Sequence, residues 1–279
     1  MMATTFGLLH PGDMGSAVGA AARAGGARVL WASAGRSGAT RTRAEAAALE
    51  DAGTLARLVA QSDVILSVCP PASAMDVARD VAALGFRGTY VDANAVSPET
   101  TKKIGELAAA AGARYVDGGL IGPPPRKPGV TRLYLSGEGA TDVAALFSEG
   151  NLQAITLDGP IGAASAIKVA YAGWNKGSQA LLLAVRAFAT HEGVDEPLLA
   201  EWARSQPDLA KRSENAVASN VKKAWRFVGE MEEIAASFSA VGLPDDFHQA
   251  CAEIYRRLAG WKDTPTPPSV TEVAKTLAP

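Results

Sequence analysis

Cysteine, histidine and aromatic residues are scarce in this chain of 279 residues. Its only cysteines, Cys69 and Cys251, are too few for a disulfide framework and suit a reducing cytoplasm. The three histidines lie far apart, with no cysteine or carboxylate pattern around them, so we expect no metal site. No uncharged apolar run approaches the roughly eighteen residues that a membrane helix needs. No basic segment leads into an apolar run near the start, so we expect no secretory signal either.

Excess charge is missing as well. The net charge is −2, which gives no overall basic field to favour nucleic acid or an anionic membrane surface. Hydrophobic residues make up 48% of the chain and charged residues 20%. This balance is typical of a soluble globular protein with a sizeable buried core, and the expected partner is a small molecule.

Short apolar runs alternate with alanine-rich segments over the first 160 residues. This alternation predicts βαβ units and a doubly wound parallel sheet covered on both faces. The expected strands cover residues 5–9, 29–33, 64–69, 89–93, 114–117, 131–136 and 154–157, and the expected helices cover 16–24, 42–48, 55–60, 74–84, 98–111 and 142–147.

Strand alternation disappears after Gly162, and the rest of the chain is expected to be helical. A helix of nearly thirty residues is predicted over 163–191, followed by helices near 197–205, 208–229, 231–241 and 245–259. The last seventeen residues contain four prolines and are expected to form a loosely docked arm. The predicted layout is a Rossmann-like domain over 1–161, an all-helical domain over 162–262 and a proline-rich tail over 263–279.

The first strand leads into a glycine turn that could hold a phosphate. A dinucleotide loop reads G-x-G-x-x-G, and here that window is His10-Pro11-Gly12-Asp13-Met14-Gly15. Gly12 would let the backbone approach a pyrophosphate, which the start of the next helix favours, and Gly15 would let that helix pack on the strand. His10 replaces the first glycine, so an ordinary turn is the alternative.

The end of the second strand bears on the choice of cofactor. An acidic residue there favours NAD, whereas its loss together with an arginine admits the 2′-phosphate of NADP. The segment "WASAGRSGATRTR" has no carboxylate, and Ser33, Arg36 and Ser37 are placed to hold a phosphate. NADP is therefore the predicted cofactor, and a solvated basic loop is the alternative.

Three further motifs point to a known family. "GDMG" at 12–15, "VDANAVSPET" at 91–100 and "GPIGAASAIKVAYAGWNKG" at 159–177 follow one another at the expected spacing. Together they resemble the β-hydroxyacid dehydrogenase family, which includes 3-hydroxyisobutyrate and 6-phosphogluconate dehydrogenases. Residues 192–259 resemble a poorly characterised C-terminal domain found on some members. The resemblance implies an oxidoreductase that uses a nicotinamide cofactor and forms a homodimer through its helical domain.

The resemblance also implies a general acid–base at Lys168, which matches the family's catalytic lysine. A charged side chain in the apolar stretch "AASAIKVAYAG" is costly to bury without a purpose, and a desolvated lysine there could pass a proton to a substrate oxygen. The alternative is a lysine whose ammonium group reaches water from the helix end. The family's asparagine four residues later is here Ala172, and Asn175 and Tyr171 are candidate substitutes on the same helix face.

The substrate segment departs from the family pattern, which usually reads Ser-Gly-Gly. The matching region is "GGLIGPPPRKPG", in which three successive prolines have no N–H to donate to a carboxylate. Gly122, Pro123 and Pro124 are expected to line the substrate site, with Arg126 or Lys127 as possible donors. Trp174 is a candidate for an apolar wall of the same site.

Two strand ends complete the expected cofactor crevice. Val68, Cys69 and Pro70 follow the fourth strand, and Asn94 falls where the resemblance places the nicotinamide side of the cofactor. Cys69 is expected to be a packing residue, because no histidine lies near it in the sequence.

The function expected from these features is an NADPH-dependent oxidoreductase acting on a small carbonyl or hydroxy substrate. An imine reductase is the first alternative: a proline-lined site favours it, whereas Lys168 counts against it, because that group resembles the same family but usually has Asp or Tyr there. The second alternative is a protein that binds NADPH without turnover, which the changes at His10 and Ala172 favour.

Overall fold

A computed structural model describes residues 3–278, and the chain divides into two compact units, 3–168 and 169–278. The first contains an eight-stranded sheet in the order β3-β2-β1-β4-β5-β6-β7-β8. The strands are β1 (Thr5–Leu8), β2 (Arg28–Trp31), β3 (Glu50–Asp51), β4 (Val64–Ser67), β5 (Thr89–Asp92), β6 (Arg114–Ile121), β7 (Thr131–Ser136) and β8 (Leu152–Thr156). The sheet is mostly parallel, as predicted, and only the β6–β7 pair is antiparallel.

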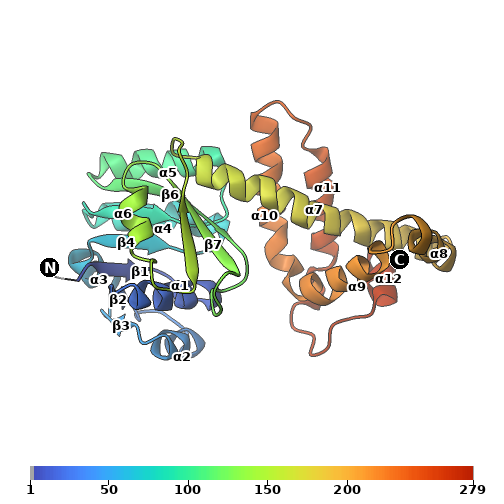
Figure 1. Ribbon diagram of the computed structural model, residues 1–279, viewed down its shortest axis with the longest axis horizontal. Helices are drawn as coiled ribbons and strands as arrows, with labels where there is room; N and C mark the ends of the chain where they lie inside the picture. The colour runs from blue at the N-terminus through green and yellow to red at the C-terminus, as the bar shows by residue number, and fades with distance from the viewer. Residues whose placement is uncertain (1–2, 279) are drawn as a thin grey trace. The chain divides into compact units, whose positions relative to one another are not determined.

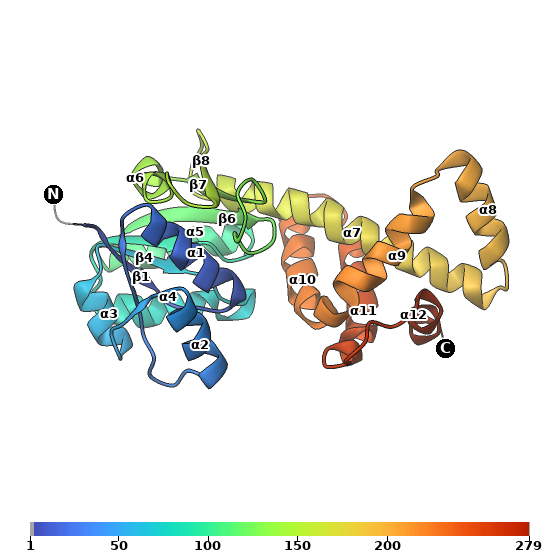
Figure 2. The same cartoon turned by 60° about the horizontal axis from the view of Figure 1, so that its bottom comes forward.

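Helices cover both faces of this sheet, as Figures 1 and 2 show. Apolar residues of α1 (Asp13–Ala24), α2 (Gly38–Ala46) and α6 (Ala140–Ala145) pack in one core cluster. A second cluster joins α3 (Leu55–Gln61), α4 (Ala74–Ala83) and α5 (Pro98–Ala110) to the opposite face. Parallel strands buried on both faces are expected to be continuously apolar; β4 is apolar until its last residue, Ser67, and β5 has polar residues at both ends, Thr89 and Asp92.

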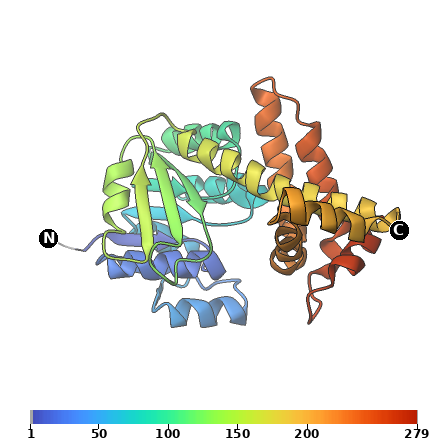
Figure 3. The same ribbon diagram turned by 45° about the vertical axis from the view of Figure 1, so that its right-hand side comes forward.

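Two differences from the predicted strands have physical causes. β3 contains only Glu50 and Asp51, and two exposed acidic residues give no hydrophobic pattern to detect. β6 extends to Ile121, four residues beyond its expected end, because Gly118 and Gly119 lie in the strand and not in a turn. The last three strands, β6, β7 and β8, lie side by side in Figure 3.

The long helix α7 (Ala163–His191) has the predicted bounds; it begins in the first unit and ends in the second. The second unit continues with α8 (Asp195–Ser205), α9 (Leu209–Asn220), α10 (Ala224–Ala240), α11 (Asp246–Arg257) and α12 (Val270–Leu277). The prediction of one helix over 208–229 is wrong. The 3₁₀ turn Val221–Lys223 interrupts this segment, and α10 continues through Gly229.

The expectation of a loosely docked tail is also wrong for α12. Ser269 and Glu272 form a capping box at its start, which satisfies backbone donors and fixes where the helix begins. Val273, Ala274 and Leu277 are buried in the core of the helical unit. The four prolines therefore flank a docked helix. Among the described residues no helix is long and apolar enough to cross a membrane.

Candidate functional site

The turn between β1 and α1 has the geometry of a phosphate cradle. Gly12 N–H donates to His10 O (2.8 Å), and α1 begins at Asp13 with no described side chain capping its first turn. A Cβ on Gly15 would lie 2.1 Å from His10 O, so only glycine allows this contact. The start of α1 therefore presents backbone N–H groups beside the carboxyl end of β1, where an anion is favoured.

His10 fits this loop because its carbonyl, and not its side chain, contacts Gly15. The imidazole is half-buried, and its Nδ1 has no hydrogen-bond partner within the described residues. Burial, assisted by the positive charge of Arg36, lowers the pKa of His10 to about 4. The side chain is therefore neutral at physiological pH and adds no charge to the cradle.

Two arginines connect this turn to the loop after β2 and to α2, and a third lies beside them. Arg36 donates to Leu9 O (3.3 Å), and Arg43 donates to Pro11 O (3.3 Å). Arg41 donates to Ser33 O (3.1 Å), and Ser37 caps α2 by accepting from Thr40 N–H. The predicted 2′-phosphate residues, Ser33, Arg36 and Ser37, thus lie in a basic segment that the structure ties to the glycine turn.

Asp51 is a residue of this region that sequence reasoning missed. It is the second residue of β3, and its partner on the neighbouring strand β2 is Trp31. Its Oδ1 accepts from the N–H groups of Gly53 (2.7 Å) and Ser33 (3.2 Å). Burial raises its pKa, but the hydrogen bonds from Ser33 and Gly53 and the charge of Arg41 outweigh burial and lower it overall. The carboxylate therefore holds the β2 loop in place.

Asn94 is placed by a buried hydrogen-bond network at the ends of β4 and β5. Its Oδ1 accepts from Cys69 N–H, and its Nδ2 donates to Ser67 Oγ (3.1 Å) and Asp92 Oδ2 (2.9 Å). Burial raises the pKa of the Cys69 thiol to about 11, which agrees with a packing role. Val68 and Cys69 are half-buried, and Pro70 is exposed. The predicted residues after β4 and β5 are thus brought together.

A row of polar side chains crosses the sheet at this level. Ser67, Asp92, Asp117 and Ser136 occupy paired positions on β4, β5, β6 and β7, and each is at most 1% exposed. Burial, with the charge of Asp117, raises the pKa of Asp92 to about 7 although its hydrogen bonds with Asn94 lower it. The sequence signal was present in "VDAN" and "VDGG", but only the register shows that the two aspartates are neighbours.

Lys168 lies on the first turns of α7, and its Nζ donates to Leu120 O of β6. A Cβ on Gly119 would lie 2.4 Å from Ala164 O and 3.3 Å from Lys168 Cβ, so this glycine lets α7 approach the strand closely. The side chain is half-buried. Lys168, the predicted general acid–base, therefore contacts β6 within the first unit.

The loop after β6 contacts the start of α1 through Arg126. Gly122 has a φ of +122°, and a Cβ there would meet Val130 O at 2.2 Å, which restricts the position to glycine. Pro123 O accepts from Thr131 Oγ1, Pro124 is half-buried, and Arg126 forms an ion pair with Asp13 at the start of α1. Through Arg126, the loop predicted to bind the substrate thus contacts Asp13, a predicted cofactor residue, within the first unit.

The remaining predicted residues lie on the part of α7 in the second unit. Asn175 Oδ1 accepts from Gln179 Nε2 (3.2 Å). Tyr171 is 47% exposed and Trp174 is 71% exposed. Their roles stay predictions.

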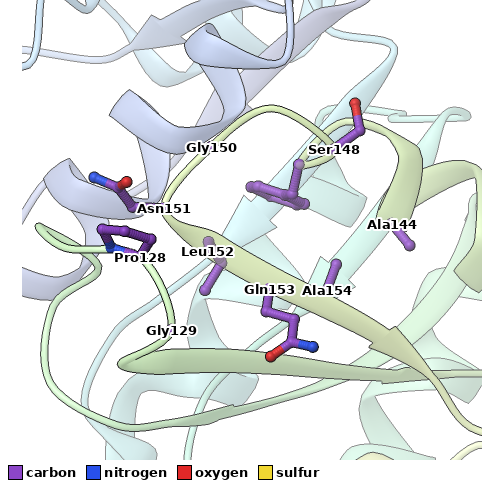
Figure 4. Close-up of a pocket in the computed structure, with 10 residues that line it drawn as sticks. Pro128, Gly129, Ala144, Ser148, Gly150, Asn151, Leu152, Gln153 and Ala154 are labelled. Atoms are coloured by element: carbon purple, nitrogen blue, oxygen red, sulfur yellow. The ribbon is translucent and has the colours of Figure 1, made fainter.

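A separate cavity of about 360 Å³ lies at β8. Figure 4 shows residues that line it, among them Asn151, Leu152 and Gln153. The cavity contains none of the predicted site residues and no charged side chain. Groups of His, Cys, Asp and Glu that could hold a metal ion do not occur within residues 3–278.

The comparisons with known proteins agree with this fold. The chain has the fold of the β-hydroxyacid dehydrogenases, and residues 189–258 match the family described as a domain of unknown function (DUF1932). The predicted resemblance, including the poorly characterised C-terminal domain, is confirmed.

Two structures illustrate the range of relatives. A conserved protein of unknown function, described as similar to 3-hydroxyacid dehydrogenases, has 26% identity and a TM-score of 0.71, covering 92% of this chain and 97% of its own. The 3-hydroxyisobutyrate dehydrogenase of Mycobacterium tuberculosis, studied with L-serine, has 18% identity and a TM-score of 0.72 over the full length of both chains.

A reductive aminase from Aspergillus terreus, in complex with NADPH and ethyl levulinate, has 18% identity and a TM-score of 0.58, covering 98% of this chain and 99% of its own. An uncharacterized 28.5 kDa protein of Methanothermus fervidus is 33% identical over 142 residues. That match covers 51% of this chain and spans about half of the relative, 54% of its length.

Proposed function

We propose that this chain is an NADPH-dependent oxidoreductase that interconverts a small carbonyl compound and its hydroxy product. The observation that carries the proposal is the uncapped start of α1, which Gly15 brings against His10 O, beside a loop that contains Arg36 and Ser37. These groups fit a dinucleotide: backbone donors for the pyrophosphate, and a guanidinium and a hydroxyl for the 2′-phosphate. The free thiols Cys69 and Cys251 suit a reducing cytoplasm, which is part of the proposal.

Lys168 is the proposed general acid–base. When bound, the nicotinamide supplies or accepts the hydride. Lys168 Nζ would then hold the proton that the substrate oxygen gains or loses, and Leu120 O orients that nitrogen through its hydrogen bond. Asn175 and Tyr171 remain the proposed substitutes for an asparagine at position 172.

Substrate binding is proposed at Gly122, Pro123 and Pro124. The prolines give no N–H groups, which disfavours the usual backbone clamp for a carboxylate. This observation also favours the second candidate, an imine reductase, because a neutral imine substrate would not need that clamp. The similarity to a reductive aminase in complex with NADPH also supports this second candidate.

Cofactor binding is tested by titrating the protein with NADPH and with NADH, using Arg36→Ala beside the wild type. A charged hydrogen bond is worth about 1.5–3 kcal/mol, so Arg36→Ala should weaken NADPH binding by about 10- to 100-fold and leave NADH binding nearly unchanged. Arg23→Ala, an exposed arginine at the other end of α1, is the matched control. Equal affinity of the wild type for both cofactors would contradict the assignment of NADP.

Turnover is tested by NADPH oxidation with keto acids, semialdehydes and cyclic imines. Turnover of a carbonyl substrate that Lys168→Ala abolishes supports the dehydrogenase proposal. Turnover of imines alone, unaffected by Lys168→Ala, moves the chain to the reductase candidate. Tight NADPH binding with no turnover on the whole panel supports the third candidate, a non-catalytic NADPH-binding protein.

A homodimer is also proposed, from one face of α7. Tyr171, Trp174, Leu181 and Phe188 are 47–71% exposed and follow one another at intervals of three, seven and seven residues. This spacing places them in one apolar stripe along the helix, as in a helix that packs against a partner. Trp174→Ser with Phe188→Ser should convert a dimer to a monomer in light scattering, and an unchanged mass would contradict this interface.

A further inference from the structure

The first turn of α7 is capped by residues of other elements. A helix start leaves four backbone N–H groups without intrahelical partners. Here Asp117 Oδ2 accepts from the N–H groups of Gly162 (2.9 Å) and Ser165 (3.0 Å), and Ser136 Oγ accepts from Ala164 N–H (3.1 Å). These two acceptors lie on β6 and β7, 19 residues apart in the sequence. The first turn of α7 is therefore held by the sheet.

Asp117 is completely buried and fully hydrogen-bonded. Its Oδ1 accepts from Ser165 Oγ (2.6 Å) and Thr101 Oγ1 (3.1 Å), and its Oδ2 also accepts from Ser136 Oγ (3.1 Å). A buried carboxylate is costly unless donors surround it. Five donors from β7, α5 and the start of α7 supply them, and the partial positive charge of the helix start adds to the attraction.

The same strand contacts α7 again just beyond this cap. Successive side chains of a strand point to opposite faces, so Asp117 and Gly119 share a face of β6. Gly119 lies against Ala164 O and Lys168 Cβ, and the next carbonyl, Leu120 O, accepts from Lys168 Nζ. One short stretch of β6 therefore holds both the first turn of α7 and the end of the lysine side chain.

We propose that Asp117 is a positioning residue for Lys168: by capping the first turn of α7 it fixes the depth and rotation of the helix, and so the place of the lysine nitrogen on β6. This inference rests on the proposed role of Lys168. Asp117 does not touch a substrate; it acts through Lys168. Ser136 provides a second acceptor for the first turn of α7, and the Ser165 hydroxyl provides a second donor to Asp117.

The first test reads Lys168 directly and does not need turnover. Trinitrobenzenesulfonate modifies unprotonated amines, and mass spectrometry gives the rate at Lys168 across a pH series. Asp117→Asn keeps the size of the side chain but removes its charge and replaces one acceptor oxygen by an amide donor, and Ser136→Ala removes the acceptor of Ala164 N–H and one donor to Asp117. Each variant should change the Lys168 rate by roughly tenfold, the effect of one pKa unit. Lysines on the helical unit, such as Lys275, should react as in the wild type.

Thr54→Ala is the matched control, because it removes the side-chain cap of α3 in the same unit and contacts no part of α7 through that cap. An unchanged Lys168 rate in Ser136→Ala and in folded Asp117→Asn would overturn the proposal. If Asp117→Asn does not fold, Ser136→Ala and Ser165→Ala decide it, and an unchanged rate in both overturns it.

The second test uses turnover once a substrate is found. Misplacing a catalytic group by about 1 Å can cost 10²-fold, so Asp117→Asn should lower kcat by about 10- to 100-fold with NADPH affinity unchanged. In a Lys168→Ala background the same substitution should lower the residual kcat little further. Equal losses in both backgrounds would overturn the proposal. If the wild type binds no NADPH and turns nothing over, the proposed function fails, whereas the labelling result still stands or falls by itself.

Discussion

Arg126 and Asp13 form an ion pair although 113 residues separate them in the sequence. Asp13 is the only acidic residue in the first turn of α1, and Arg126 follows the three prolines of the loop after β6. The loop that the sequence analysis assigns to the substrate therefore reaches the glycine turn assigned to the cofactor. This contact gives the prolines a structural role, since they stiffen the approach of Arg126.

Removing Arg126 should weaken NADPH binding. A carboxylate at the first position of α1 repels an incoming pyrophosphate unless a cation neutralises it. Charges near a helix start are worth about 0.3–1 kcal/mol, so Arg126→Ala should weaken binding about two- to fivefold at low salt. The effect should shrink in 1 M salt, because both side chains are exposed.

A double-mutant cycle checks the cause. In an Asp13→Asn background, Arg126→Ala should have almost no effect on the NADPH dissociation constant. Lys127→Ala, the neighbouring exposed cation, is the control. A loss of the same size in both backgrounds would mean that Arg126 acts without Asp13.

Asp92 should make the protein less stable as the pH rises from about 4 to about 7. Burial raises its pKa from 3.8 to about 7 in the folded chain. Below pH 4 the carboxyl is protonated in both states; above it the unfolded chain loses the proton first, so stability falls until the folded carboxyl also ionises. Three pKa units correspond to at most about 4 kcal/mol. Relative to the wild type, Asp92→Asn should therefore gain thermal stability as the pH rises through this range, whereas Asp158→Asn, an exposed aspartate, should have a profile parallel to that of the wild type.

His10 should act in the opposite direction within nearly the same range. Its folded pKa of about 4 lies below the ordinary 6.5, because burial disfavours the charged form. The unfolded chain therefore takes up the proton first, and up to about 3 kcal/mol of stability is lost as the pH falls from 6.5 to 4. In the wild type the two effects largely cancel. His10→Asn should then unmask the Asp92 trend in thermal unfolding; a His10→Asn profile parallel to that of the wild type, with His191→Asn as the exposed control, would refute the assignment.

Leu277 of α12 should contribute to the stability of the helical unit. It is 7% exposed and packs in the same core as Val273 and Ala274. Leucine-to-alanine changes in a core cost about 2–5 kcal/mol, so Leu277→Ala should lower the denaturant midpoint, whereas Thr271→Ala on the exposed side of α12 should not. Equal midpoints for Leu277→Ala and the wild type would instead indicate that α12 is only loosely docked.

The sequence predicted the fold because hydrophobic periodicity and helix caps are local signals. The strand at 131–136 and the helix at 163–191 have the predicted bounds, and the glycine turn falls between a strand and a helix as expected. The tail helix was missed because its prolines suggest an extended arm, whereas its Ser269–Glu272 capping box and buried face are the stronger signals.

The site was predicted less completely, because its polar residues become neighbours only through the pairing of the strands. Asp92 and Asp117 are 25 residues apart, and nothing local in the sequence indicates that they face each other. Asp51 reaches the Ser33 backbone through a strand of two residues, which has no periodicity. Register and side-chain burial depend on packing of the whole sheet, which single motifs do not encode.

The shortness of β3 has a consequence for how the protein behaves at high concentration. An edge strand offers unpaired backbone groups to other chains, and long apolar edges promote aggregation. This edge ends in Glu50 and Asp51, both exposed, and Glu50 is paired with Arg28 of the neighbouring strand. A strand from a second molecule would find only two residues to pair with and would have to approach two carboxylates. The sheet is therefore protected from growing at its β3 edge.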